Sequence, residues 1–285
     1  MAVEAPYISE KLVPNIRGYL HLFLGRKIVE VPWMDKNGVT LAYFDARNPI
    51  LQDVGARELA RLTIFFSKPR IVISPSSGKS TEMIARACQM VDSKPTLLEF
   101  QKGNPKSPIM QHHIVNAAYS VKYKPITAEE RSERIMTVTM DQADMIREMV
   151  KNSSEDLVFM DDVISTGATI DAMRELVAKI LQIPKEELKF PALAVVNECC
   201  VGSDGKMVEG YDENTAYAVQ TPVFASTDDV GIFNVMPYVS YPYSNNSVPY
   251  FHPRTTNSEP LDPLLAVPQI VAQDFVSITD PYILH

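Results

Sequence analysis

Two adjacent carboxylates stand just before a short turn of small hydroxyl-bearing residues. Asp161 and Asp162 end an apolar run that begins at Val158, and residues 165–169 follow with the sequence STGAT. The N–H groups of such a turn and the positive end of a following helix bind an anion, which Gly167 lets the backbone approach closely. Carboxylates would repel that anion, but they suit two hydroxyl groups one sugar ring away. The segment therefore predicts a site for a 5-phosphorylated ribose.

This segment resembles the binding motif for 5-phosphoribosyl-1-pyrophosphate (PRPP) in type I phosphoribosyltransferases: apolar residues, two acids and a Thr-Gly-x-Thr turn. The resemblance implies that Asp161 and Asp162 hold the 2′- and 3′-hydroxyls of the ribose. An ordinary strand-to-helix turn with a capped helix would explain the hydroxyl residues but not the two acids. By the same resemblance, the 5-phosphate is bound by Ser165, Thr166, Gly167, Ala168 and Thr169.

A second loop of small residues follows the apolar run at 70–74 and has the sequence PSSGKST. It ends like the phosphate-binding loop of nucleotide triphosphatases, but the first glycine of that motif is replaced by Ile73, inside the expected strand. The loop resembles the pyrophosphate loop of adenine and xanthine phosphoribosyltransferases. A nucleotide triphosphatase and a plain helix cap remain as alternatives. The resemblance assigns pyrophosphate binding to Ser76, Ser77, Gly78 and Lys79.

Two lysines lie in residues 100–108, a stretch similar to a lysine-bearing stretch of adenine phosphoribosyltransferases. Lys102 matches the first lysine, Lys106 is displaced by one residue, and Gln101 stands where the family has arginine. The resemblance implies that both lysines neutralise pyrophosphate, in that family sometimes across a dimer interface. Two solvated loop lysines are the alternative.

Residues 116–123 resemble the flexible catalytic loop of the same family. Tyr119 and Tyr123 match its two tyrosines, whereas Lys122 replaces its glutamate, which implies a different base or proton acceptor. We therefore expect Tyr119 and Lys122 at the active site, with tyrosines that merely pack a loop as the alternative. Residues 104–133 show little apolar periodicity and are predicted to form a long mobile lid.

The elements that position these residues follow from the apolar pattern. Between about residues 40 and 200, short apolar runs alternate with helical periodicity, which is typical of an α/β fold with a largely parallel sheet flanked by helices. Type I phosphoribosyltransferases have such a sheet. The predicted strands are 70–74, 96–100, 157–161 and 192–197, with 135–140 as an edge strand or hairpin arm. The predicted helices are 54–66, 80–91, 142–150 and 170–181.

Three regions are expected along the chain. Residues 1–39 form an N-terminal segment that, by the resemblance, could belong to a base-binding hood. Residues 40–221 form the phosphoribosyltransferase core, and residues 222–285 form an extended C-terminal arm. This arm is rich in proline, which disfavours helices and central strands, and in aromatic residues, which are scarce in disordered chains.

Bulk composition narrows the possible partners. A net charge of -8 predicts no nucleic-acid partner, although local lysines and Mg²⁺ can still hold a small phosphorylated ligand. Three cysteines without ligand spacing indicate neither a disulfide framework nor a metal site. No apolar run reaches the roughly 20 residues that span a bilayer, and the N-terminus lacks a secretory pattern. A cytoplasmic protein without a membrane partner is expected.

The expected activity is transfer of phosphoribose from PRPP to a ring nitrogen of a nucleobase, with release of pyrophosphate. The resemblance implies a purine base, a role in purine salvage, a homodimer, and Mg²⁺ held mainly by PRPP with Asp161 and Asp162 as further ligands. Three alternatives remain open. They are a non-catalytic PRPP-binding regulator, a transferase for a non-purine acceptor, and a P-loop nucleotide triphosphatase.

Overall fold

The computed structural model describes residues 3–4, 16–24, 27–36, 39–66, 68–124, 133–150, 156–200, 214–224 and 250–253. Its strands are β1 Val3–Glu4, β2 Ile16–Leu24, β3 Lys27–Lys36, β4 Val39–Ala42, β5 Ile71–Ser76, β6 Thr96–Gly103, β7 Tyr119–Tyr123, β8 Arg134–Val138, β9 Leu157–Ile164, β10 Ala192–Cys200, β11 Thr215–Phe224 and β12 Tyr250–Pro253. Its helices are α1 Pro49–Phe66, α2 Thr81–Met90, α3 Pro108–Val115, α4 Met140–Met149 and α5 Ala168–Leu181, with a 3-10 turn at Lys185–Glu187.

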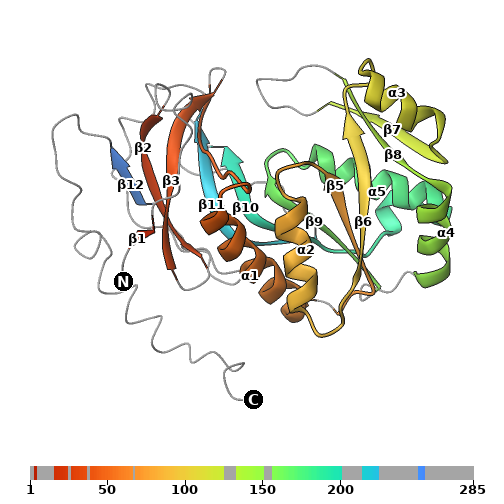
Figure 1. The fold of residues 1–285 in the computed structure, drawn as a ribbon, viewed down its shortest axis with the longest axis horizontal. Coiled ribbons are helices and arrows are strands. Elements are labelled where there is room, and N and C mark those ends of the chain that lie inside the picture. The colour runs from red at the N-terminus through yellow and green to blue at the C-terminus, as the bar shows by residue number, and fades with distance from the viewer. Residues whose placement is uncertain are drawn as a thin grey trace.

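The described strands form one mixed sheet with helices on both faces (Figure 1). Their order is β12-β2-β3-β4-β11-β10-β9-β5-β6-β8-β7, and β1 pairs with β3. The five central strands, β11 to β6 in that order, are parallel, whereas β4 and β8 join them antiparallel on either side. The predicted α/β fold with a parallel sheet flanked by helices is therefore confirmed.

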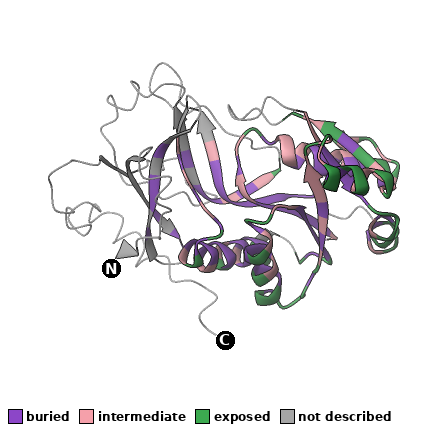
Figure 2. Cartoon of the chain, turned by 45° about the horizontal axis from the view of Figure 1, so that its top comes forward, coloured by how far each residue is buried: buried purple, intermediate pink, exposed green. Residues whose placement is uncertain are grey.

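Two apolar clusters lie on opposite faces of this sheet. One packs α1 and α2 against the strands through residues such as Val54 and Ile84. The other packs α4 and α5 against them through residues such as Ile146 and Met173. Figure 2 shows the strands in the middle of the sheet almost wholly in the colour of buried residues. Because helices cover both faces, these strands are continuous apolar runs rather than alternating ones.

The predicted elements lie where the sequence placed them, with shifted ends. Helix α1 starts five residues before the predicted 54 because the Asn48 side chain accepts hydrogen bonds from the N–H groups of Ile50 (2.9 Å) and Leu51 (3.4 Å), with Pro49 at the first helical position. Strand β9 runs three residues past the predicted 161 because Val163 and Ile164 continue to pair with β10. The predicted hairpin arm at 135–140 is β8, which pairs with β7.

Residues 104–133, which are predicted to form a lid, contain α3 and β7 in their described part. Ser107 caps α3 by accepting a hydrogen bond from the N–H of Met110 (3.2 Å), and Pro108 stands in its first turn. The Met110 side chain packs directly over Gly103. A Cβ added at Gly103 would lie only 2.5 Å from the Cγ of Met110. Because Met110 is the one fully buried residue of α3, the helix has no apolar periodicity to detect. Residues 125–132 lie outside the described residues.

Parts of the predicted N-terminal segment and C-terminal arm join the sheet. Strands β2, β3 and β4 form an antiparallel unit that continues the sheet from β11. Strand β12 pairs with β2 at the sheet edge, where a strand that contains proline is tolerated. The remainder of the arm, and the side chains of Cys199 and Cys200, lie outside the described residues. No helix within the described ranges is long and apolar enough to cross a membrane.

Candidate functional site

The sheet has a point at which its connections diverge. Strands β5 and β9 are parallel neighbours. From β5 the chain runs through α2 to β6 on one side, and from β9 it runs through α5 to β10 on the other. Parallel α/β sheets bind ligands outside the carboxyl ends of strands at such a point. Both loops selected from the sequence, residues 77–80 and 165–167, lie at these ends, which face the top of Figure 1.

The two acids lie in the last half of β9, shortly before its carboxyl end. Asp161 is 4% exposed, and its Oδ1 accepts a hydrogen bond from the backbone N–H of Asp162 (3.0 Å). Burial raises the pKa of the Asp161 carboxyl well above its ordinary value. The positive charge of Lys102 opposes that rise, and the neighbouring Asp162 carboxylate adds to it. Asp161 is thus a buried acid beside one cation, whereas Asp162 is half-buried.

The turn after β9 requires glycine and leaves its N–H groups open to a ligand. Gly167 has φ of 76°, a left-handed conformation that side chains disfavour, and it stands at the N-cap of α5. No side chain caps the first turn of this helix. The capped-helix alternative for Ser165 and Thr166 is therefore not what the structure shows, and the first-turn N–H groups have no acceptor within the helix. An anion is the natural partner for this turn.

The loop after β5 is held by hydrogen bonds between Ser77 and Ser80, and no side chain caps α2. The Ser77 hydroxyl lies 2.6 Å from the Ser80 hydroxyl and accepts a hydrogen bond from the Ser80 N–H (3.3 Å). Gly78 differs, because a Cβ added there would meet nothing within 4 Å. The surrounding protein therefore leaves space at Gly78 for a ligand to approach the backbone. Ile73, at the position of the first glycine of a P-loop, is fully buried within β5, which argues against a nucleotide triphosphatase.

Lys79 contacts a loop that the sequence did not assign to the site. Its Nζ lies 5.8 Å from the centroid of the Tyr43 ring, and Asp45 in the same loop feels its charge. Partial burial would raise the pKa of Asp45, but hydrogen bonds and charge from Arg47, with help from Lys79, lower it overall. Arg47 bonds both carboxylate oxygens of Asp45, at 2.8 and 2.7 Å. Residues 43–47 therefore lie beside the loop after β5.

The remaining predicted residues fall into two groups. Lys102, at the end of β6, is close enough to Asp161 to oppose the rise in its pKa. Lys106 is exposed, and within the described ranges no ion pair involves its side chain. Lys122 is 63% exposed and pairs with Glu133 at 2.9 Å, so the structure brings neither Lys106 nor Lys122 to the acid pair.

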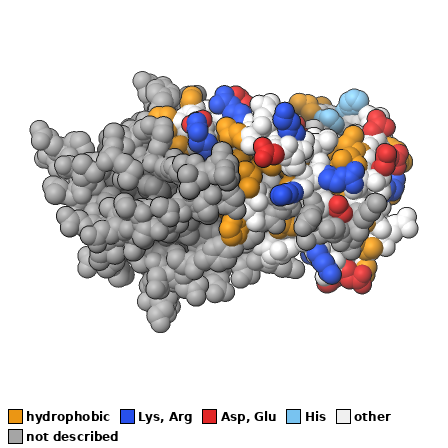
Figure 3. All heavy atoms as spheres, turned by 90° about the horizontal axis from the view of Figure 1, so that it is seen from below, with side chains coloured by type: hydrophobic (Ala, Val, Ile, Leu, Met, Phe, Trp, Pro, Cys, Tyr) orange, Lys and Arg blue, Asp and Glu red, His pale blue; other side chains and the backbone are white. Residues whose placement is uncertain are grey.

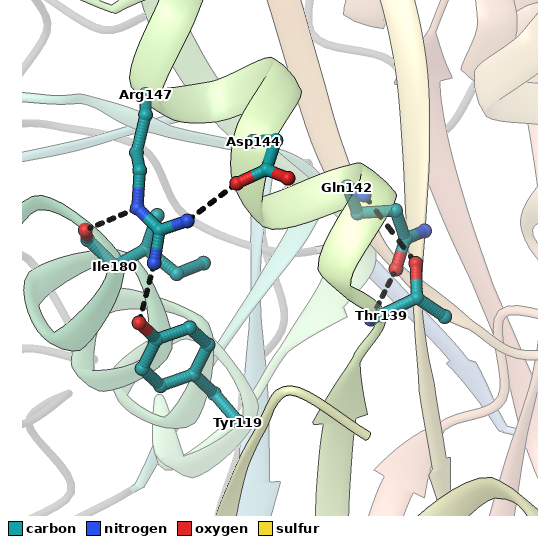
Figure 4. Close-up of polar contacts among 6 residues, drawn as sticks. All are labelled: Tyr119, Thr139, Gln142, Asp144, Arg147 and Ile180. Atoms are coloured by element: carbon teal, nitrogen blue, oxygen red, sulfur yellow. Dashed lines mark hydrogen bonds and ion pairs between the residues drawn. The ribbon is translucent and has the colours of Figure 1, made fainter. Parts of the chain in front are cut away.

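The two tyrosines of β7 have different surroundings. Tyr119 accepts a hydrogen bond from Arg147 of α4, and the same guanidinium donates to the Ile180 carbonyl near the end of α5 at 3.3 Å (Figure 4). Tyr123, at the other end of the strand, hydrogen-bonds the Thr169 side chain in the first turn of α5. The structure therefore brings Tyr123 to the predicted phosphate turn. Tyr119 lies four residues away on the same strand, a separation of about 13 Å at a rise of about 3.3 Å per residue.

The described residues contain no group of three or more His, Cys, Asp or Glu that could hold a metal ion. The site instead offers two neighbouring carboxylates, a lysine, an open glycine and an uncapped helix start, all near the carboxyl ends of the central strands. Such a set suits a ligand that carries hydroxyl groups for the acids and phosphate groups for the cation and the N–H groups.

No family model and no curated protein matches the sequence. The chain is similar to solved structures of phosphoribosyltransferases, of which three are described here. The adenine enzyme of Trypanosoma brucei, in complex with AMP, pyrophosphate and ribose-5-phosphate, has 17% identity and a TM-score of 0.37 over 66% of this chain and 72% of its own. The adenine enzyme of Saccharomyces cerevisiae has 14% identity and a TM-score of 0.35 over 66% of this chain and 87% of its own. The purine enzyme of Pyrococcus horikoshii has 15% identity and a TM-score of 0.32 over 68% of this chain and 93% of its own.

The similarity to phosphoribosyltransferases that the motifs indicate thus recurs among solved structures. A likeness at these identities and TM-scores does not decide an activity. The activity has to come from the side chains at the carboxyl edge of the sheet.

Proposed function

We propose that the chain binds PRPP and transfers its phosphoribosyl group to a nucleobase. The observation that carries the proposal is the acid pair in the last half of β9, followed five residues after Asp162 by the left-handed Gly167 and an uncapped helix start. A carboxylate pair accepts hydrogen bonds from two vicinal hydroxyls, and the turn binds a phosphate one ring away. Among common metabolites, a 5-phosphorylated ribose has this layout.

Each part of the site has a task in such a transfer. Asp161 and Asp162 hold the ribose hydroxyls, and residues 165–169 hold the 5-phosphate, so that the sugar carbon is fixed in place. Positive charge grows on the sugar as the pyrophosphate leaves with negative charge. Lys102 and the N–H groups around Gly78 stabilise that leaving group, with Lys79 beside them.

Magnesium fits this site as an ion brought by the substrate. Mg²⁺ commonly binds through one or two carboxylates together with substrate phosphates. The chain supplies such carboxylates in Asp161 and Asp162, and it lacks a three-residue cluster in its described part. The bound ion would neutralise the pyrophosphate oxygens as the bond to the sugar breaks.

The acceptor, assembly and compartment are further proposals. A purine is the proposed base, and a homodimer in the cytoplasm is the proposed form of the protein. A transferase for a non-purine acceptor and a non-catalytic PRPP-binding regulator are the other candidates. The residues on β7 bear on the acceptor, because Lys122 is paired with Glu133 and so is not available as a proton acceptor for the base.

The deciding experiment is pyrophosphate release from PRPP and Mg²⁺ with a panel of purine, pyrimidine and other nitrogenous bases. Release with one or more purines supports the proposed function. Release with another base alone identifies a non-purine transferase. Tight PRPP binding without release for any base identifies a regulator. Hydrolysis of ATP with no PRPP binding would overturn the proposal.

A further inference from the structure

Tyr123 and Arg134 lie side by side where β7 ends and β8 begins, at the connected end of the hairpin. They are direct Cα partners in the antiparallel register, and Val121 and Met136 are partners two residues along. Val121 and Met136 are both buried in the cluster that packs α5 against the sheet. Because side chains two residues apart on a strand share a face, Tyr123 and Arg134 project toward the same α5 side.

Lys102 lies on that face as well. It is the Cα partner of Met136 in the register between β6 and β8, and partners across a strand pair share a face. Arg134 is two residues from Met136, so Lys102 and Arg134 are diagonal neighbours, about 7–8 Å apart between Cα atoms. Two cations on adjacent strands thus point to one side of the sheet.

The start of α5 completes this group. The Tyr123 hydroxyl hydrogen-bonds the Thr169 side chain in the first helical turn. The pKa of Tyr123 is raised, mainly by burial and further by the charge of Asp161. The charges of Lys102 and Arg134 and the hydrogen bond to Thr169 oppose this rise. Two cations and one deeply buried carboxylate therefore act on this hydroxyl group, beside N–H groups that favour an anion.

We propose that Arg134 binds the 5-phosphate of the phosphoribosyl donor, with Tyr123 holding the Thr169 end of the phosphate turn. This inference rests on the proposed function and adds to it a residue that lies 33 positions from the turn in sequence. A guanidinium presents a planar fork of donors that matches two oxygens of a phosphate, which a single lysine cannot do.

The test compares two probes that separate the two ends of the donor. Binding of ribose 5-phosphate and of pyrophosphate is measured by calorimetry for the unaltered chain, Arg134→Gln and Arg134→Lys. The expected result is a loss of tenfold or more in ribose 5-phosphate affinity for Arg134→Gln, a smaller loss for Arg134→Lys, and unchanged pyrophosphate affinity. Arg57→Gln is the matched control, since Arg57 lies on α1, across the sheet, and pairs with Asp53 at 3.1 Å.

Unchanged ribose 5-phosphate affinity in Arg134→Gln would overturn the inference and leave the proposed function standing. A loss confined to pyrophosphate would also overturn it, because Arg134 would then serve the leaving group. If Arg134→Gln does not fold, Arg134→Lys decides by a raised KM for PRPP at an unchanged kcat. Binding of neither PRPP nor ribose 5-phosphate by the unaltered chain would count against the proposed function and this inference together.

Discussion

At the scale of single residues, the two acids of the motif are not equivalent. Asp161 is 4% exposed and feels the charge of Lys102, while Asp162 is half-buried. A buried carboxylate without full compensation costs folding stability, and proteins keep such groups where function needs them. Asp161 therefore has the character of a functional residue that the fold alone does not require.

Replacing Asp161 by Asn is expected to stabilise the fold while it reduces activity. The raised pKa of Asp161 means that its ionised form opposes folding at neutral pH. The gain in melting temperature should be largest above the folded-state pKa and should vanish as the pH falls to about 3, below the unfolded-state pKa of about 3.9, where the carboxyl is protonated in both states. The value of kcat/KM should fall by roughly 10²-fold, or about 2.7 kcal/mol. A variant less stable than the unaltered chain at pH 8 would contradict this.

The glycines of the two loops make a matched pair of probes. Gly78→Ala should leave the free energy of unfolding within about 0.5 kcal/mol, because the added Cβ meets nothing within 4 Å. Its KM for PRPP should nevertheless rise several-fold, because only a bound pyrophosphate would meet the methyl group. Gly167→Ala should destabilise by about 1–2 kcal/mol through its φ of 76°. An unchanged KM in Gly78→Ala would remove this loop from the pyrophosphate site.

At the scale of elements, the β7–β8 hairpin packs on α5 at both ends. Arg147 ties Tyr119 to the end of α5, and Tyr123 reaches its first turn (Figure 4). Helix α4 holds Arg147 in place and is fixed by a capping box between Thr139 and Gln142, at 3.1 and 3.3 Å. Strand β7, which belongs to the segment predicted to form a lid, is therefore packed against α5 at both of its ends.

Arg147→Gln tests this packing. It removes hydrogen bonds to Tyr119 and to the Ile180 carbonyl, and it should lower the free energy of unfolding by about 1 kcal/mol, as measured by urea denaturation. The KM for PRPP should change less than twofold. A fall of 100-fold in kcat at unchanged stability would instead show that Tyr119 acts in the reaction, as the sequence predicts.

At the scale of the whole molecule, the proposed ligand site lies at the carboxyl ends of the central strands. Figure 3 views the molecule from below, the side opposite these strand ends, where Lys and Arg side chains are interspersed with Asp and Glu over the described part. The described residues on that face form no broad basic surface. The net charge of -8 agrees with the proposal of a small phosphorylated ligand that is held locally.

Ligand choice can be measured on the whole protein by melting temperature. PRPP with Mg²⁺ should raise it more than ATP with Mg²⁺ at equal concentration, because a ligand that binds only the folded state stabilises it. Binding at 100 times the Kd would add about 2.7 kcal/mol. A larger shift with ATP would reverse the ranking between a phosphoribosyltransferase and a P-loop enzyme.

The sequence by itself determined the parts of the site that are continuous in the chain. The acids, the turn at 165–169 and the glycine loop could be predicted because strand, turn and helix follow one another within about a dozen residues. The parallel sheet could be predicted because buried strands are continuous apolar runs. Helix α3 could not, since one buried methionine gives no period.

Only the tertiary structure decided which distant residues share the site. It separates Tyr119 from Tyr123 because the two ends of a strand meet different ends of α5. It turns Lys122 away, toward Glu133, because alternate residues of a strand face opposite sides. It also adds Arg134 through strand register, which depends on pairing between segments and leaves no local signal in the sequence.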